Sequence, residues 1–121
     1  MEEKLSLPLV PAVRAGDTIY LSGQVGFQTW GVLVEGGIEE QTRQTLLNIQ
    51  SVLEAEGAGP GDLVKLTAWI TDASLFAGFN HAYTAFFRGL AVPARTTVVS
   101  ALAIPGSLVE IDGIAAIGRR Q

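Results

Sequence analysis

The chain has 121 residues, and its eight basic and twelve acidic side chains give a formal net charge of −4 and an isoelectric point near 4.8. This balance lacks the basic surface with which proteins hold nucleic-acid phosphates, so we expect no nucleic-acid partner. The chain contains no cysteine and one histidine, which argues against disulfides, a cysteine nucleophile and a zinc or other metal site.

The length suits one domain, residues 1–121. No stretch approaches the ~18 unbroken apolar residues of a membrane-spanning helix. The N-terminal sequence MEEKLSLPLVP has two acids before its first lysine and no long apolar core, unlike a secretory signal. We therefore expect a cytoplasmic protein with no membrane partner. A mean hydropathy of +0.34 is high for a small soluble chain, and it predicts that part of the surface is covered in an oligomer.

The first half of the chain predicts strands broken by glycine, followed by a helix. Residues 18–21 favour a strand that runs into the glycine break Ser22-Gly23-Gln24. The segment TWGVLVEGG, residues 29–37, predicts a hairpin region. From Ile38 the apolar period changes to three or four residues, which predicts a helix of about five turns ending at residues 57–60. The predicted apolar side of this helix consists of Ile38, Thr42, Leu46, Ile49 and Leu53.

The second half predicts a strand, a helix and two further strands. Residues 62–70 alternate between apolar and polar side chains, which is typical of a strand with one dry side. Residues 75–86 have helical spacing, with Asp72 or Ser74 as the cap. Two strands follow, at residues 95–103 and 108–117. This order predicts an α+β fold, in which two helices pack on one face of a mixed sheet. Within the second helix, the stripe Phe79, Tyr83 and Phe86 is interpreted as core, and Asn80 as a local hydrogen-bonding residue.

Arg95 stands at the head of an otherwise apolar, β-branched strand, VPARTTVV. A guanidinium stays charged in proteins, and burying it without a partner costs several kcal/mol, roughly 3–5 where a pair is broken. Arg95 is therefore solvated, paired with a carboxylate of its own chain, or available to an external anion.

The last strand carries two carboxylates on one side. Side-chain alternation in SLVEIDGIAAI places Glu110 and Asp112 on the same face, opposite Val109 and Ile111. In one interpretation this face is partly wet, or one of the acids forms a structural bridge with Arg95. In the other, Arg95 and Glu110 lie on neighbouring strands and line one pocket.

Three segments carry a resemblance to a known family: IYLSGQVG at 19–26, NHAYTAFF at 80–87, and PARTTVVSALAIPGSLVEIDGIAA at 93–116. They resemble the reactive intermediate deaminase family, also called YjgF-like or Rid. Its C-terminal signature is Pro-Ala-Arg, an alternating strand, a short turn and an apolar-Glu-Ile triplet, here Pro93-Ala94-Arg95 and Val109-Glu110-Ile111. The resemblance runs from about Asp17 to Arg119, with the elements in family order.

The resemblance implies a chorismate-mutase-like α+β fold and a homotrimer with ligand clefts between subunits. It implies cofactor-free hydrolysis of 2-imino and 2-enamino acids to 2-keto acids and ammonia. In that reaction Arg95 would bind the carboxylate of a small 2-imino or 2-keto acid, and Glu110 would activate water. Ser22 and Gly23 would offer hydroxyl and backbone groups at the pocket wall.

The chain departs from the family pattern at three positions. Active members commonly carry a tyrosine near the N-terminus that reaches the ligand, where the corresponding residue here is Leu9. Thr97 stands where many members have cysteine, so it joins Leu9 as an expected substrate-binding position, and Thr96 is also unusual. The missing tyrosine favours an alternative function, a non-catalytic trimer that binds or senses small carboxylates. Older family labels, translation inhibition and cleavage of single-stranded RNA, are disfavoured by the acidic composition.

Overall fold

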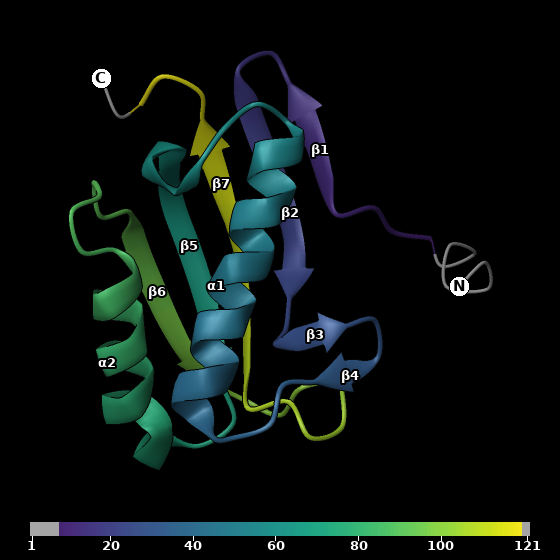
Figure 1. Ribbon diagram of the computed structural model, residues 1–121, viewed down its shortest axis with the longest axis vertical. Coiled ribbons are helices and arrows are strands. Elements are labelled where there is room, and N and C mark those ends of the chain that lie inside the picture. Colours follow the sequence, from purple (N-terminus) through teal and green to yellow (C-terminus); the bar gives the residue numbers. More distant parts are fainter. Residues whose placement is uncertain (1–7, 120–121) are drawn as a thin grey trace.

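The fold is built on a five-stranded mixed sheet (Figure 1). The computed structural model describes residues 8–119, so the prediction about a secretory signal concerns residues that lie largely outside the described part. The strand order is β1-β2-β7-β5-β6, in which β5 and β6 run parallel and the other neighbours antiparallel. The strands are β1 (Ala12–Ala15), β2 (Thr18–Gln24), β5 (Leu63–Ile70), β6 (Ala94–Val99) and β7 (Val109–Ala116).

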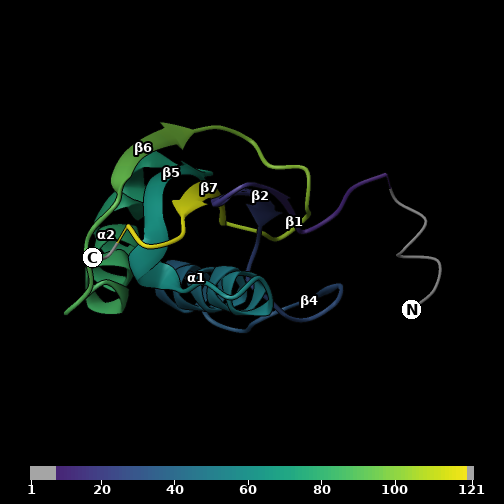
Figure 2. The same ribbon diagram turned by 90° about the horizontal axis from the view of Figure 1, so that it is seen from above.

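Two helices, α1 (Ile38–Ala55) and α2 (Phe76–Phe86), lie side by side on one face of this sheet (Figures 1 and 2). Seen from above, the opposite face has no helix over it among the described residues (Figure 2). The predicted α+β fold with both helices on one face is therefore confirmed. Neither helix is long and apolar enough to cross a membrane.

The core fills the space between the helices and the sheet. Strand alternation sends every second side chain of β2, β5 and β7 toward α1 and α2. The side chains with no exposed surface include Ile19, Leu46, Leu53, Leu63, Leu66, Ala68, Ile70, Phe79, Val109, Ile111 and Ala115. An irregularity between Leu63 and Lys65 shifts the register of β5, so Leu63 rather than Val64 is the fully buried residue at its start.

Helix α1 follows its predicted bounds, and glycine ends it as expected. Gly57 adopts a φ of 79°, a left-handed conformation that favours glycine. The helix also buries two polar residues that periodicity did not predict, Gln41 and Thr45. Gln41 donates to the Gly106 carbonyl at 3.2 Å and accepts from the Leu108 amide at 2.8 Å. It thereby holds the loop between β6 and β7 against the helix.

Helix α2 is preceded by a single 3₁₀ turn at Ala73–Leu75. The Asp72 carboxylate accepts from the Ser74 amide at 2.8 Å, so the predicted cap acts on this 3₁₀ turn, whereas α2 itself begins after Leu75 without a side-chain cap. The aromatic stripe is core only in part: Phe79 and Tyr83 are buried, whereas Phe86 is half-buried.

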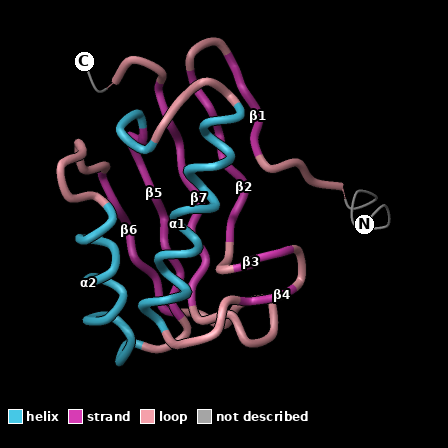
Figure 3. The backbone as a smooth tube through the Cα atoms, viewed as in Figure 1, coloured by secondary structure: helices cyan, strands magenta, loops and turns pink. Residues whose placement is uncertain are grey.

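Other boundaries differ from the sequence-based expectation (Figure 3). The hairpin forms as β3 (Phe27–Thr29) and β4 (Val32–Leu33), a separate two-stranded sheet. Strand β1 was not predicted, because its four residues carry almost no buried side chain to mark it. Strand β6 ends at Val99 rather than at 103, where the chain leaves the sheet edge and has no further strand to pair with.

Candidate active site

Arg95 lies on the helix-facing side of the edge strand β6. It pairs in register with Leu66 of β5, which is fully buried beneath the helices, so the two side chains share that face. Its guanidinium carbon stands 4.6 Å from the ring centre of Tyr83 and 5.0 Å from that of Phe79, both on α2. The side chain is therefore held at the junction of β6 and α2, and it is half-buried there.

A groove opens at this junction. It has a volume of about 850 Å³, within the range of small-molecule sites. Its polar lining comes from Asn80, Tyr83 and Thr84 of α2, from Arg88 just after it, and from Arg95. None of the described residues that line the groove is acidic, although the chain carries a net charge of −4. Two arginines without a carboxylate make this groove an attractive place for an anion.

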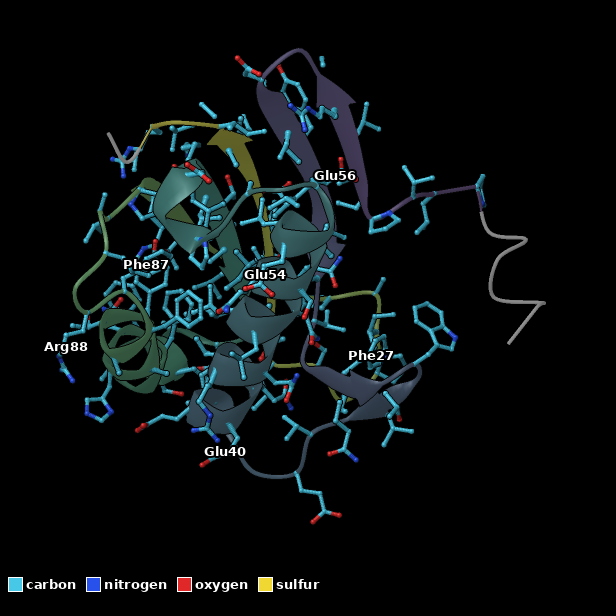
Figure 4. All side chains as sticks on the ribbon, turned by 45° about the horizontal axis from the view of Figure 1, so that its top comes forward. Phe27, Glu40, Glu54, Glu56, Phe87 and Arg88 are labelled. Carbon is cyan, nitrogen blue, oxygen red and sulfur yellow. The ribbon has the colours of Figure 1, made fainter. Side chains whose placement is uncertain are left out.

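Two consecutive side chains just after α2, those of Phe87 and Arg88, point in opposite directions (Figure 4). Phe87 points toward the interior, whereas Arg88 points away from the body of the molecule (Figure 4). Arg95, not Arg88, is therefore the cation that stands against the aromatic wall of the groove.

Arg95 and Glu110 do not meet within one chain. Strand β5 lies between β6 and β7, so the prediction that the two residues occupy neighbouring strands was wrong. Glu110 pairs in register with Trp69, on the face that the helices leave open, whereas Arg95 lies on the helix-facing side. Both last strands carry the apolar, alternating pattern of strands in a sheet, but such a pattern does not say which strand separates them.

The structural bridge that sequence reasoning left open is also absent. Among residues 8–119, no carboxylate lies within ion-pair distance of the Arg95 guanidinium, and the ion pairs described are Arg14–Asp17 and His81–Glu39. Of the three fates considered for Arg95, pairing with an acid of its own chain is therefore excluded within the described residues.

Glu110 and Asp112 form an acidic pair on the open face of β7. Burial, followed by the neighbouring Asp112 charge, raises the pKa of Glu110 above its ordinary value. Burial also raises the pKa of Asp112, although the Lys65 ammonium and a hydrogen bond from the Thr67 backbone oppose that rise. A carboxyl with a raised pKa accepts a proton more readily near neutral pH than an ordinary carboxyl.

Gly23 of strand β2 lies against Glu110, and Ser22 precedes it on the same strand. A Cβ at Gly23 would collide with the Glu110 carboxylate, so glycine is what allows the acid to lie flat against β2. The Ser22 hydroxyl donates to the Val10 carbonyl at 2.5 Å, and the Ser22 amide donates to the Pro11 carbonyl at 3.0 Å. Its donors therefore hold the N-terminal segment in place, and that segment carries Leu9, whose side chain is 64% exposed.

Thr97 lies two positions after Arg95 on the same side of β6. Its hydroxyl oxygen is buried without a hydrogen-bond partner among the described residues. The predicted site residues thus divide into two groups, Arg95 and Thr97 beside α2, and Glu110, Ser22 and Gly23 on the open side. Asn80 and Tyr83 belong to the first group, and sequence reasoning missed them because helical periodicity marks such residues only as core or surface.

Comparisons with known proteins agree with this architecture. The family model described as "Endoribonuclease L-PSP" matches residues 2–117. A mouse protein named 2-iminobutanoate/2-iminopropanoate deaminase is 39% identical over 112 residues, which cover 92% of this chain and 82% of the mouse protein.

Two solved structures from Escherichia coli superpose closely. The YjgF gene product has a TM-score of 0.85 and 35% identity, with 90% of this chain and 87% of that chain covered. TdcF with bound serine has a TM-score of 0.85 and 30% identity, with 91% and 88% covered. The architecture is thus the chorismate-mutase-like fold of YjgF, and the chain belongs to the Rid/YjgF family, described by its family model as Endoribonuclease L-PSP.

Proposed function

We propose that the protein hydrolyses 2-imino acids to 2-keto acids and ammonia without a cofactor. The observation that carries the proposal is the Arg95 groove, in which, among residues 8–119, the guanidinium has no acid partner and no carboxylate lines the space it faces. Such a groove suits a small carboxylate, the group that every 2-imino acid carries. Family relatives at about 38% identity are named 2-iminobutanoate/2-iminopropanoate deaminase, which supports this substrate class.

In the proposed reaction Arg95 binds the substrate carboxylate through two parallel N–H donors. Water attacks the imine carbon while its proton passes to the Glu110 carboxylate. Glu110 passes this proton to the imine nitrogen, which gives a carbinolamine with C–OH and C–NH2 groups. The hydroxyl proton then passes to nitrogen as the C–N bond breaks, so that ammonia leaves and the carbonyl of the 2-keto acid remains. The raised pKa of Glu110 supports its role as the base, because its proton affinity lies closer to that of the group it serves.

The proposed site needs two copies of the chain. Arg95 and Glu110 lie on opposite faces of the sheet, with β5 between their strands, so one copy cannot apply both to one substrate. The open face also exposes apolar side chains, namely Val13, Tyr20 and Val98, which a further copy would cover. We propose a homotrimer in which Arg95 of one protomer and Glu110 of its partner share a cleft.

The reaction is tested with an amino-acid oxidase that generates imines from alanine, leucine and other donors, while semicarbazide competes for them. We expect the protein to suppress semicarbazone formation. In the Arg95→Ala variant, kcat/KM should fall by about 10- to 150-fold, the equivalent of one charge-assisted carboxylate contact.

The melting temperature of Arg95→Ala serves as the control. Since no carboxylate of the described residues pairs with Arg95, its removal leaves no buried acid unpaired, and we expect little change in Tm. A loss of about 3–5 kcal/mol in unfolding free energy would contradict the proposed role, because that is the effect of breaking a buried bridge.

A second candidate is a trimer that binds small carboxylates without turnover. The structure of TdcF with bound serine favours it, as does the expected replacement of the family tyrosine by Leu9. Binding of 2-oxobutanoate without suppression of semicarbazone formation, for every amino-acid donor, would favour this candidate over the enzyme.

A further inference from the structure

Three aromatic rings of α2 lie beneath the Arg95 guanidinium. Its central carbon stands 4.6 Å from the ring centre of Tyr83, 5.0 Å from that of Phe79 and 5.9 Å from that of Phe76. These residues recur at spacings of three and four along the helix, which brings their side chains to one side of it. All three distances fall within the range in which a ring face attracts a cation.

This arrangement places the guanidinium over aromatic rings, which accept no hydrogen bond from it of the kind a carboxylate would. The N–H donors of arginine lie in the plane of the group. Among residues 8–119, no described hydrogen bond or ion pair occupies them. A carboxylate in place of the rings would take up the same donors and cancel the charge. Aromatic support therefore orients Arg95 without consuming the groups that bind a ligand.

Tyr83 is the nearest of these rings and the best fixed. It is 5% exposed and packs between Phe79 and Phe87, with ring centres 5.6 and 4.8 Å away. Burial raises the pKa of its phenol to about 12, against the opposing effect of the Arg95 charge. The phenol therefore stays neutral near pH 7 and does not act as a counter-ion to Arg95. Its hydroxyl oxygen has no hydrogen-bond partner among the described residues.

We infer that Tyr83 is a positioning residue, whose ring face orients Arg95 for the carboxylate of the substrate. The inference rests on the proposed function only in taking Arg95 as the carboxylate-binding group. The ring acts through Arg95 and not on the reacting atoms, so its loss weakens ground-state and transition-state binding equally. Such a loss raises KM and leaves kcat nearly unchanged.

The experiment compares Tyr83→Leu, Tyr83→Phe and Phe86→Leu. Phe86 is the matched control, because it is an aromatic residue of the same helix that neither lines the groove nor stands over Arg95. We expect Tyr83→Leu to raise KM, and the Kd of 2-oxobutanoate measured by calorimetry, by about 3- to 30-fold. Tyr83→Phe keeps the ring and should stay within about 2-fold of the unchanged chain, and Phe86→Leu should lower Tm without a change in KM.

A spectroscopic measurement makes the test independent of turnover. The Nε–Hε signal of Arg95, assigned by its loss in Arg95→Lys, should show a ring-current shift and restricted motion. Both should be reduced in Tyr83→Leu, in which only the more distant rings of Phe79 and Phe76 remain, and both should persist in Tyr83→Phe and Phe86→Leu. Should Tyr83→Leu fail to fold, Tyr83→pentafluorophenylalanine keeps the shape of the ring, reverses its quadrupole, and should raise KM and Kd in the same way.

The outcomes separate this inference from the proposed reaction. If the protein hydrolyses no imine, the reaction fails, while a weaker Kd together with a reduced ring-current shift of Arg95 in Tyr83→Leu still supports the positioning role. If Tyr83→Leu and Phe86→Leu change KM, Kd and the Arg95 signal alike, Tyr83 is only a core residue and the inference is overturned. An unchanged Kd and Arg95 signal in Tyr83→Leu would overturn it as well.

Discussion

The Arg95 groove and the Glu110–Asp112 pair differ in what surrounds the charged group. In the groove, aromatic rings of α2 lie beneath a cation, and no acid of the part of the chain that the structure describes lies beside it. On the open face, two acids share one strand, and burial together with their mutual repulsion raises the pKa of Glu110. The cation is thus kept charged and oriented, whereas the acid is made a better proton acceptor.

The two regions also differ in how complete they are within one chain. The groove is built from α2, β6 and the turn between them, segments that are consecutive in the sequence. The acidic pair lies on a face over which no helix of the described residues packs (Figure 2). In the proposed function, each protomer therefore contains its own carboxylate-binding groove, whereas the proposed chemistry requires assembly.

We expect the largest effect from Glu110→Gln, which distinguishes the role of the acidic pair from that of the Arg95 groove. Glutamine keeps the shape of the side chain and cannot accept the water proton, so kcat should fall by about 10²- to 10⁴-fold. The Kd of 2-oxobutanoate should not rise, because Arg95 supplies the proposed carboxylate contact and glutamine removes a negative charge from the shared cleft. Steady-state kinetics measures kcat, and calorimetry measures Kd. A fall in affinity as large as the fall in kcat would contradict the assignment of catalysis to Glu110 and of carboxylate binding to Arg95.

A mixing experiment tests whether the two regions meet between copies. Arg95→Ala and Glu110→Gln should each be nearly inactive alone. In a trimer refolded from an equal mixture, chance places an intact Arg95 opposite an intact Glu110 in about a quarter of the clefts. We therefore expect about a quarter of the unchanged activity to return. Activity no higher than that of the two separate variants would show that one copy supplies both residues, contrary to the proposed assembly.

The smallest expected effect concerns Asp112 and pH. The pKa of Asp112 is raised in the folded chain, so folding favours the protonated carboxyl. The stabilising contribution of the protonated form is present below the ordinary pKa of 3.8 and is lost as the pH rises through the raised pKa. Asp112→Asn removes this titration. We expect a gain of about 0.5 kcal/mol or less in unfolding free energy at pH 7, and none below pH 3.8.

Scanning calorimetry at both pH values measures this difference. Asp17→Asn provides a control, since Asp17 is an exposed acid whose closest charged contact is Arg14 at 3.6 Å. A gain for Asp112→Asn that persists unchanged at low pH would show that the effect is not the titration of this carboxyl.

Much of the fold could be predicted because local patterns encode it. The period of α1 and its glycine end, the Asp72 cap, and the alternation of Glu110 and Asp112 against Val109 and Ile111 depend on residues close in the sequence. Strand β1 was not predicted, because an edge strand with almost no buried side chain leaves no hydrophobic pattern. The buried Gln41 escaped for a related reason, since its partners lie 65 and 67 residues away.

The sequence by itself determined most of the elements, their order, the family signature and the two charged anomalies, because periodicity, capping and turn chemistry act over a few residues. Only the tertiary structure decided that β5 separates β6 from β7, and that Arg95 and Glu110 face opposite ways. Strand order is set by long-range pairing, which leaves no trace in the alternation of a single strand. Arg95 likewise contacts the aromatic rings of α2 only because the parallel pairing of β6 with β5 places Arg95 beside that helix.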